Sequence, residues 1–133
     1  MGPRVSVVIP AYNNEQYLGQ TLRSALAQTF EDYEVVVADH SSTDGTAAVI
    51  EQFRGEERLR ILDPTPAGGG AKANWNRVSA AATGELIKLL PGDDVIAPNL
   101  LANQVAAFDA HPSVVMAAVR RSMVDAHGET IMA

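Results

Sequence analysis

The sequence predicts an α/β fold with a mostly parallel sheet covered by helices on both faces. Short runs of apolar, often β-branched residues alternate along the chain with segments whose apolar residues recur at helical spacing. Strands that alternate with helices pair in parallel, because each helix returns the chain to the same end of the sheet. Polar residues follow three of the apolar runs. They would therefore meet at the carboxyl edge, where such sheets bind ligands.

Each element is expected from its own residue pattern. The predicted strands cover residues 5–9, 34–38, 59–62, 86–90 and 114–119. The predicted helices start at Asn13 and Asn14, after the turn-forming cluster at 41–46, near Lys72 and at Pro98. Gly84 and Pro112 end the last two helices, since both residues disfavour continuation.

The composition is that of one ordinary globular domain spanning residues 1–133. Apolar residues make up 47% of the chain and charged residues 20%, which suits a packed core rather than a disordered chain. The net charge of −6 argues against nucleic-acid binding. No cysteine is present, so disulfides and cysteine-based zinc sites are excluded. We find neither a signal-peptide pattern nor an apolar run long enough for a membrane span, and we expect a cytoplasmic protein.

Two adjacent carboxylates, Asp93 and Asp94, follow the strand predicted at residues 86–90. Pro91 and Gly92 end that strand and would present the two acids at its carboxyl end. Mg²⁺ and Mn²⁺ prefer oxygen ligands, and a site with few protein carboxylates leaves room for substrate phosphates. We therefore expect a divalent-metal site here. The alternative is an acidic turn that caps the next helix.

Residues after the first two strands could contact a nucleotide. Tyr12 could stack on a nucleobase, because stacking needs only a π-face, or it could pack over the start of a helix. Asp39 could accept hydrogen bonds from a ribose hydroxyl or a base N–H, or it could cap the next turn. His40 could donate a hydrogen bond to the nucleotide or simply be solvated.

The segment after the third strand is expected to be a mobile connector or lid, since residues 64–70 are rich in proline and glycine. Lys72 and Arg77, on the helix that follows, are the nearest basic candidates for a diphosphate, unless they form only a solvated helix face. The single tryptophan, Trp75, is expected to pack under the sheet rather than to contact a substrate. Glycine-rich phosphate loops of the dinucleotide-binding and P-loop types are absent.

Five segments resemble the opening part of the inverting family 2 glycosyltransferases, which have the GT-A fold. They are VSVVIPAYN at 5–13, SALAQTF at 24–30, STDGT at 42–46, ATGELI at 82–87 and GDDVIAP at 92–98. Their order and spacing match over nearly the whole chain, and together they are highly specific. The resemblance implies a Rossmann-like GT-A domain. It also implies a metal-dependent enzyme that transfers a sugar, with inversion, from a nucleoside diphosphate sugar.

The resemblance further implies roles for individual residues. Tyr12 would stack on the base, and Asp39 would lie in the nucleoside pocket. Asp94 would be the principal Mg²⁺ or Mn²⁺ ligand, and Asp93 would contact the ribose or the metal. The expected nucleotide site comprises Pro10, Ala11, Tyr12, Asn13, Asp39, His40, Lys72 and Asp93.

The chain departs from the family pattern at three points. His40 stands where many members have a second acid that reads the uracil N–H, so the base of the donor stays open. Pro91 replaces the first acid of the Asp-x-Asp form, so the metal site depends on Asp93 and Asp94. Family members continue further, with an acceptor-binding half and a general base. We therefore expect residues 1–133 to be a truncated, donor-binding half with little or no turnover.

The catalytic base is unassigned, because Asp125 and Glu129 lie only loosely in the right region. The acceptor is open between a polysaccharide, a lipid-linked glycan and a protein, and assembly into a homo-oligomer is also open. One alternative function is a catalytically incomplete nucleotide-binding or interaction module. Another is a nucleotidyltransferase, although that class has a glycine-rich, basic loop after the first strand, which residues 10–14 lack.

Overall fold

The computed structural model describes residues 1–133 and divides into two compact units, Met1–Leu101 and Ala102–Ala133. The first unit contains β1 (Val5–Ala11), α1 (Leu18–Leu26), β2 (Tyr33–Asp39), α2 (Thr46–Glu51), β3 (Leu59–Ile61), α3 (Gly70–Ala80) and β4 (Leu86–Leu89). Most of α4 (Leu100–Ala110) belongs to the second unit, together with β5 (Met123–Val124) and β6 (Thr130–Met132).

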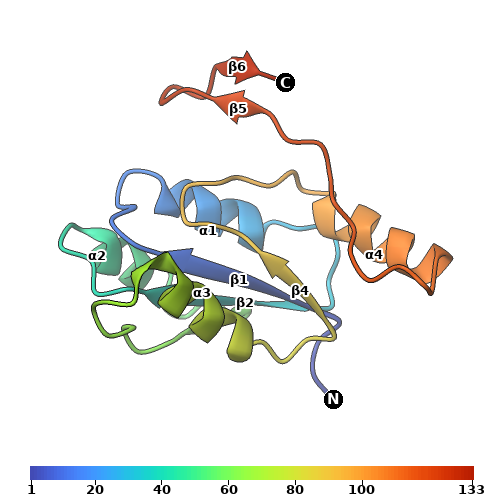
Figure 1. Cartoon of the computed structure of the whole chain (residues 1–133), viewed down its shortest axis with the longest axis horizontal. Helices are drawn as coiled ribbons and strands as arrows, with labels where there is room; N and C mark the ends of the chain where they lie inside the picture. Colours follow the sequence, from blue (N-terminus) through green and yellow to red (C-terminus); the bar gives the residue numbers. More distant parts are fainter. The chain divides into compact units, whose positions relative to one another are not determined.

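Four parallel strands form the sheet of the first unit, in the order β3-β2-β1-β4. β1 pairs with β2 along its whole length, from Val5 opposite Tyr33 to Ala11 opposite Asp39. Helix α3 lies on one face of the sheet and α1 on the other (Figure 1). From β1 the sheet extends to β2 and then β3 on one side, whereas β4 lies on the other side of β1. The order of the strands thus changes direction between β1 and β4. The carboxyl ends of these two strands therefore border the crevice where doubly wound folds bind ligands.

The two central strands form the core, because elements on both sides cover them. All seven residues of β1 are buried, and β2 is buried throughout except at the partly buried Glu34. Continuous apolar runs of this kind are typical of strands in parallel sheets. On the α3 face, Val8, Val36 and Val78 are fully buried in one cluster. Burying a side chain of this size stabilises a fold by roughly 1.5–3 kcal/mol.

One carboxylate is built into the edge of this core. Glu34 accepts hydrogen bonds from Ser6 Oγ at 2.7 Å and from the backbone N and Oγ1 of Thr83 at 2.9 and 2.8 Å. It also pairs with Arg60 at 3.1 Å. Burial alone would raise the pKa of Glu34, but these donors outweigh burial and hold the pKa at about 2. Glu34 thus joins β2 to β1, to β3 and to the turn before β4.

The predicted fold class is confirmed, and so are four of the five predicted strands. The observed strands begin or end within two residues of the predicted bounds. Helix α3 begins at Gly70, two residues before the predicted start. Helix α1 begins at Leu18 rather than at Asn13 and Asn14, because these two asparagines lie in the loop after β1. Asn13 hydrogen-bonds to Thr43 in the loop after β2, and Asn14 to Thr46 at the start of α2.

The strand predicted at residues 114–119 is wrong, since this segment pairs with no other strand. Apolar, β-branched composition is not enough for a strand without a neighbour that takes up its backbone hydrogen bonds. The carbonyl of Ala117 instead accepts a hydrogen bond from Gln104 Nε2 at 2.7 Å. In this unit β5 pairs with β6, antiparallel. No helix of the chain is both long and apolar enough to cross a membrane.

Candidate functional site

A cavity of about 530 Å³ opens at the carboxyl edge of the sheet, a size typical of small-molecule sites. Its walls come from the ends of β1, β2 and β4, from the segment after β3 and from the start of α3. The lining residues are Pro10, Ala11, Tyr12, Asn14, His40, Ser41, Thr43, Ala67, Gly68, Gly70, Ala71, Asn74, Trp75, Pro91, Gly92 and Asp93. The cavity thus brings together Tyr12, His40 and Asp93, which follow three different strands.

The loops after β1 and β2 hold each other in place. Asn13 and Ser41 both have left-handed backbone conformations, with φ of 48° and 53°. Residues other than glycine adopt these rarely, and such positions concentrate at functional sites. Asn13 Oδ1 accepts from the backbone N of Thr43, and Asn13 N donates to Ser42 Oγ, each at 2.9 Å. Asn13 is exposed and does not line the cavity, so its contact with a nucleotide stays a prediction.

Tyr12 and His40 form one aromatic corner of the cavity. The Tyr12 side chain is 57% exposed, and its ring meets the His40 ring edge-on, with 5.9 Å between centroids. His40 is only 6% exposed, so the expectation of a solvated loop histidine is wrong. Its Nε2 lies 2.9 Å from the carbonyl oxygen of Gly68. Because a carbonyl only accepts hydrogen bonds, Nε2 carries the proton, and His40 ties β2 to the segment before α3.

Asp39, the residue before His40, does not line the cavity. Its side chain is buried, and its two oxygens accept hydrogen bonds from the hydroxyl and the backbone N of Ser42, the latter at 3.2 Å. The turn-capping role considered for Asp39 is therefore present in the structure. Its contact with a nucleoside stays a prediction.

The acidic turn lies at the β4 side of the cavity. Asp93 lines the cavity and Asp94 follows it, and both residues are exposed. Helix α4 begins only at Leu100, so the two acids do not cap it, and that alternative is wrong. The described chain contains no group of three or more His, Cys, Asp or Glu side chains that could hold a metal by itself. A cation here would have only two adjacent carboxylates from the protein.

Gly92 fixes the distance between the acidic turn and the loop after β1. Gly92 is buried, and a Cβ at this position would lie 2.6 Å from Asn14 Oδ1. The same Asn14 oxygen accepts a hydrogen bond from the backbone N of Tyr12 at 2.9 Å. Only a residue without a side chain permits this close approach, which brings Asp93 next to the loop that carries Tyr12.

Helix α3 is fixed to the strand ends by a buried amide. Asn74 is 2% exposed, and its Nδ2 donates to the carbonyl of Ala38 at 2.9 Å and, more weakly, to that of Ala11 at 3.4 Å. Its Oδ1 accepts from Thr65 Oγ1 at 2.5 Å. These carbonyls lie near the carboxyl ends of β2 and β1, so Asn74 sets how the start of α3 meets the cavity.

The expectation that Trp75 packs under the sheet is wrong. Its side chain is 41% exposed and lines the cavity. Consecutive residues of a helix point about 100° apart, so the burial of Asn74 turns Trp75 outward. A sequence signal could have revealed this: Asn74 and Val78 are spaced i and i+4, and taking Val78 as the buried position places Asn74 on the same inner face.

The two basic residues of α3 do not line the cavity. Lys72 is exposed, and its predicted contact with a diphosphate stays a prediction. Arg77 has a structural role, because its guanidinium donates hydrogen bonds to the carbonyl of Asp63 and to Thr65 Oγ1, the latter at 2.9 Å. Arg77 and Asn74 therefore meet at Thr65 and hold the segment after β3 against α3.

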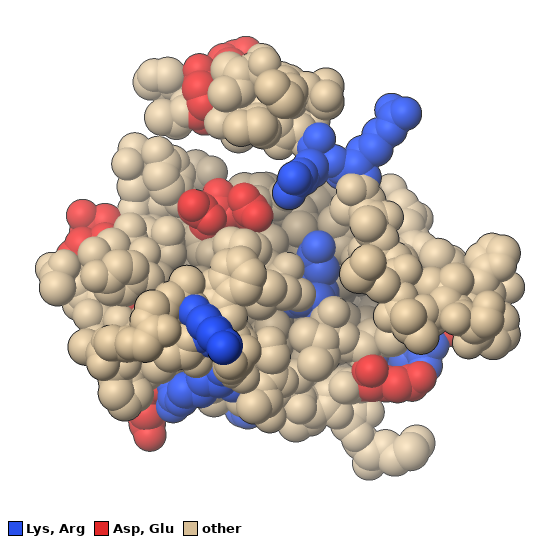
Figure 2. Space-filling view, viewed as in Figure 1, with Lys and Arg blue, Asp and Glu red and all other residues tan.

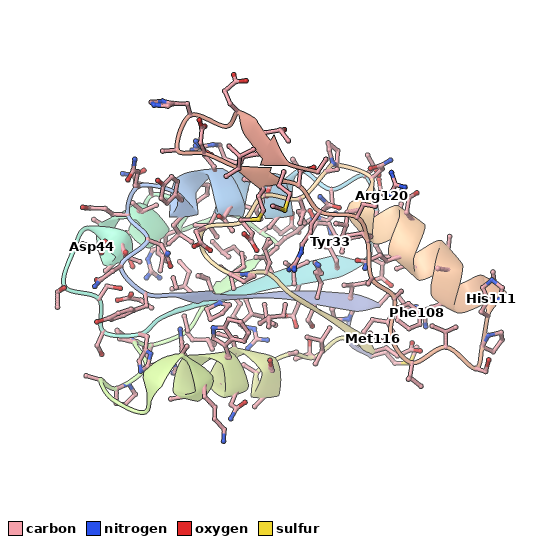
Figure 3. All side chains as sticks on the ribbon, turned by 45° about the horizontal axis from the view of Figure 1, so that its top comes forward. Tyr33, Asp44, Phe108, His111, Met116 and Arg120 are labelled. Atoms are coloured by element: carbon pink, nitrogen blue, oxygen red, sulfur yellow. The ribbon has the colours of Figure 1, made fainter.

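A second hollow of about 480 Å³ lies at the amino edge of the sheet. Tyr33, which is labelled in Figure 3 and begins β2, is among its lining residues. Its cationic groups already have protein partners. Arg58 stacks over the Tyr33 ring at 4.7 Å, and Arg60 pairs with Glu34. Burial raises the pKa of Tyr33. The face shown in Figure 2 carries both basic and acidic side chains, with uncharged residues between them.

Comparison with known proteins agrees with this geometry. The family model described as glycosyl transferase family 2 matches residues 6–131. An uncharacterized glycosyltransferase of Nostoc sp. is 35% identical over 96% of this chain. The poly(ribitol-phosphate) beta-N-acetylglucosaminyltransferase TarS of Staphylococcus aureus is 33% identical over 85% of it. The chain spans only 39% of the Nostoc protein and 20% of TarS.

Solved structures agree with the sequence relatives. A crystal structure of Staphylococcus aureus TarS in complex with UDP-GlcNAc matches 90% of this chain with a TM-score of 0.74 and 32% identity, over 38% of its own length. The mannosyltransferase PcManGT from Pyrobaculum calidifontis, in complex with GDP-Man and Mn²⁺, matches 86% with a TM-score of 0.73 and 31% identity, over 34% of its length. These structures have the GT-A fold predicted from the sequence. The chain therefore belongs to glycosyl transferase family 2.

Proposed function

We propose that residues 1–133 form the donor-binding part of a glycosyltransferase that moves a sugar, with inversion, from a nucleoside diphosphate sugar to an acceptor. One observation carries the proposal: a single cavity is lined by Tyr12, His40 and Asp93 from three strand ends. The ligands of the related structures support it, since they are UDP or UDP-GlcNAc in TarS and GDP-Man in PcManGT. The family match favours sugar transfer over the nucleotidyltransferase alternative.

In this proposal the aromatic corner holds the nucleobase. Tyr12 is exposed enough to offer a ring face to a base, and the edge contact with His40 holds that ring. With Nε2 donating to the carbonyl of Gly68, the other ring nitrogen of His40 is an acceptor whenever the imidazole carries a single proton. An acceptor can pair with the ring N–H of uracil, thymine or guanine. His40 could thus replace the acid found at this position in many family members.

The acidic turn suits a divalent cation shared with the donor. Asp93 and Asp94 supply hard oxygen ligands at the β4 side of the cavity, and two protein carboxylates leave coordination positions for phosphate oxygens. The residues therefore fit Mg²⁺ or Mn²⁺, with Asp94 as the principal ligand. Such a cation would stabilise the negative charge that develops on the departing diphosphate. Gly92 keeps the turn close to the loop that carries Tyr12.

None of the residues named above is assigned to bind or activate the acceptor. Inversion needs a base within hydrogen-bond reach of the acceptor hydroxyl. Asp125 is occupied in the β5–β6 turn, where its Oδ1 accepts from the backbone N of His127 and Glu129 at 2.8 and 3.0 Å. We assign no base, and the acceptor is a polysaccharide, a lipid-linked glycan or a protein. We expect the 133-residue chain alone to bind a donor nucleotide and to transfer little or no sugar.

Calorimetry with UDP, GDP and dTDP, each with and without Mn²⁺, tests the proposal. We expect at least one nucleotide to bind, with affinity that Mn²⁺ increases and that Asp94→Asn reduces to the metal-free value. Asp32→Asn is the matched control, because it makes the same charge change on an exposed residue just before β2, at the opposite edge of the sheet. Absence of nucleotide binding would refute the donor site. Binding that Mn²⁺ leaves unchanged would refute the metal assignment.

A further inference from the structure

Trp75 is the largest side chain that lines the cavity, and it takes no part in the proposed contacts of Tyr12, His40 and the acidic turn. It is the only tryptophan of the chain, and 41% of its surface is exposed. A tryptophan carries a large apolar surface that is costly to leave in water, and exposed aromatic rings are enriched where proteins bind ligands. Its position in a cavity wall therefore makes it a candidate contact for a bound ligand.

The orientation of Trp75 is imposed by the fold. Asn74, the residue before it, is locked by hydrogen bonds to the carbonyl of Ala38 and to Thr65, and Val78 is fully buried on the same helix face. These contacts fix the rotation of α3 about its axis. Trp75 lies about 100° further round the helix and consequently faces the cavity rather than the sheet.

The neighbouring cavity wall suits a flat, uncharged group. Ala67, Gly68, Gly70 and Ala71 line it with little side-chain volume. No lysine or arginine belongs to the lining, so this wall offers no cation to a phosphate. An aromatic ring beside small apolar residues can instead cover the face of a nucleobase or the apolar side of a ribose.

We propose that Trp75 is a second aromatic contact for the nucleoside of the donor, in addition to Tyr12. The proposal rests on the proposed function, because it names a further residue of the same donor site. Stacking on an aromatic side chain contributes enough to nucleotide binding that its loss weakens affinity at least about fivefold. Trp75 would therefore help to set both the affinity and the base preference of the site.

The single tryptophan makes the contact directly observable. Tryptophan emission, excited at 295 nm, is followed while UDP, GDP or dTDP is added with Mg²⁺, and N-acetyltryptophanamide corrects for absorption by the base. We expect a saturable change with the same Kd as calorimetry gives for that nucleotide. Pyrophosphate with Mg²⁺ should leave the emission unchanged, since it has no nucleoside. An equal change with pyrophosphate would overturn the nucleoside contact.

Variants give the second arm of the test. Trp75→Ala should weaken nucleotide binding at least about fivefold, and Trp75→Phe should keep most of the affinity because it keeps a π-face. Asn76→Ala is the control, since Asn76 is an exposed neighbour on α3 that does not line the cavity. Equal weakening by Asn76→Ala and Trp75→Ala would overturn the contact.

The outcomes separate this inference from the function on which it rests. If calorimetry detects nucleotide binding while the Trp75 emission and the affinity of Trp75→Ala are unchanged, the inference fails and the donor site stands. If no nucleotide binds to the unaltered chain, both fail together. The emission experiment uses the unaltered chain, so it decides the matter even where Trp75→Ala does not fold.

Discussion

At the scale of single residues, Asn74 holds the start of α3 against the ends of β1 and β2. Its amide spans the ends of β1 and β2 and the segment after β3, and it is almost completely buried. A buried polar group that loses its partners costs about 1–3 kcal/mol, and a buried unpaired charge costs more. The cavity wall formed by α3 therefore depends on a polar contact that a search for apolar core positions does not find.

Replacing this amide by a carboxylate of the same shape tests its role. Asn74→Asp would place a negative charge against the carbonyl of Ala38, so we expect the free energy of unfolding to fall by about 3 kcal/mol in urea denaturation. Asn76→Asp makes the same chemical change on the exposed face of α3 and should alter the free energy by no more than about 0.5 kcal/mol. Equal losses in the two variants would show that the Asn74 hydrogen bonds are not important.

The sequence was sufficient to find the polar residues at the strand ends and insufficient to orient their neighbours. Tyr12, His40 and Asp93 follow strands directly, so the parallel sheet alone brings them to one edge. The orientation of Trp75 depends on which residue of α3 faces the sheet. Hydrophobicity favoured Trp75 as the buried residue, but the polar Asn74 is buried instead. Lys72 is close in sequence to the cavity, but its place on α3 leaves it outside the lining.

At the scale of elements, the Glu34 network links three strands through one ionised carboxylate. The folded-state pKa of about 2 lies below the ordinary value of 4.5. A depressed pKa stabilises the fold at pH values above the unfolded-state pKa, and this contribution is lost as the pH falls through the folded-state pKa. The sheet should consequently lose stability between about pH 5 and pH 2.

We expect Glu34 to contribute about 2–3 kcal/mol at pH 7, measured as the part of the change in the free energy of unfolding between pH 7 and pH 2 that the unaltered protein shows and Glu34→Gln does not. Glu34→Gln should remove this part of the pH dependence and destabilise the protein at neutral pH. Glu57→Gln, at an exposed residue, should leave the profile unchanged. A profile of Glu34→Gln that parallels the unaltered protein would contradict the assigned pKa.

Among the elements, β1 and β2 were predictable because burial on both faces leaves a continuous apolar run. Residues 114–119 show the same composition, yet they form no strand and Val115 is 95% exposed. Strand formation there depends on a partner that the local sequence does not encode. The start of α1 at Leu18 also depends on distant residues, since Asn13 and Asn14 hydrogen-bond to Thr43 and Thr46.

At the scale of the whole molecule, the two ends of the sheet differ in their suitability for binding a ligand. The carboxyl edge has a cavity of about 530 Å³ with an exposed aromatic ring and an acidic turn. The amino edge has a hollow of about 480 Å³ whose arginines are already paired within the protein. Volume alone does not separate the two, so the chemistry of the lining decides in favour of the carboxyl edge.

An NMR titration of the ¹⁵N-labelled chain with UDP, GDP or dTDP shows which edge of the sheet binds the nucleotide. With Mg²⁺ present, we expect amide shifts in residues 11–14, 40–43, 67–71 and 92–95. Replacing Mg²⁺ by paramagnetic Mn²⁺ should broaden the signals of residues 92–95 first, because the cation would lie against Asp93 and Asp94. Shifts confined to the amino edge, around residues 33–34 and 57–60, or broadening far from the acidic turn, would contradict the account.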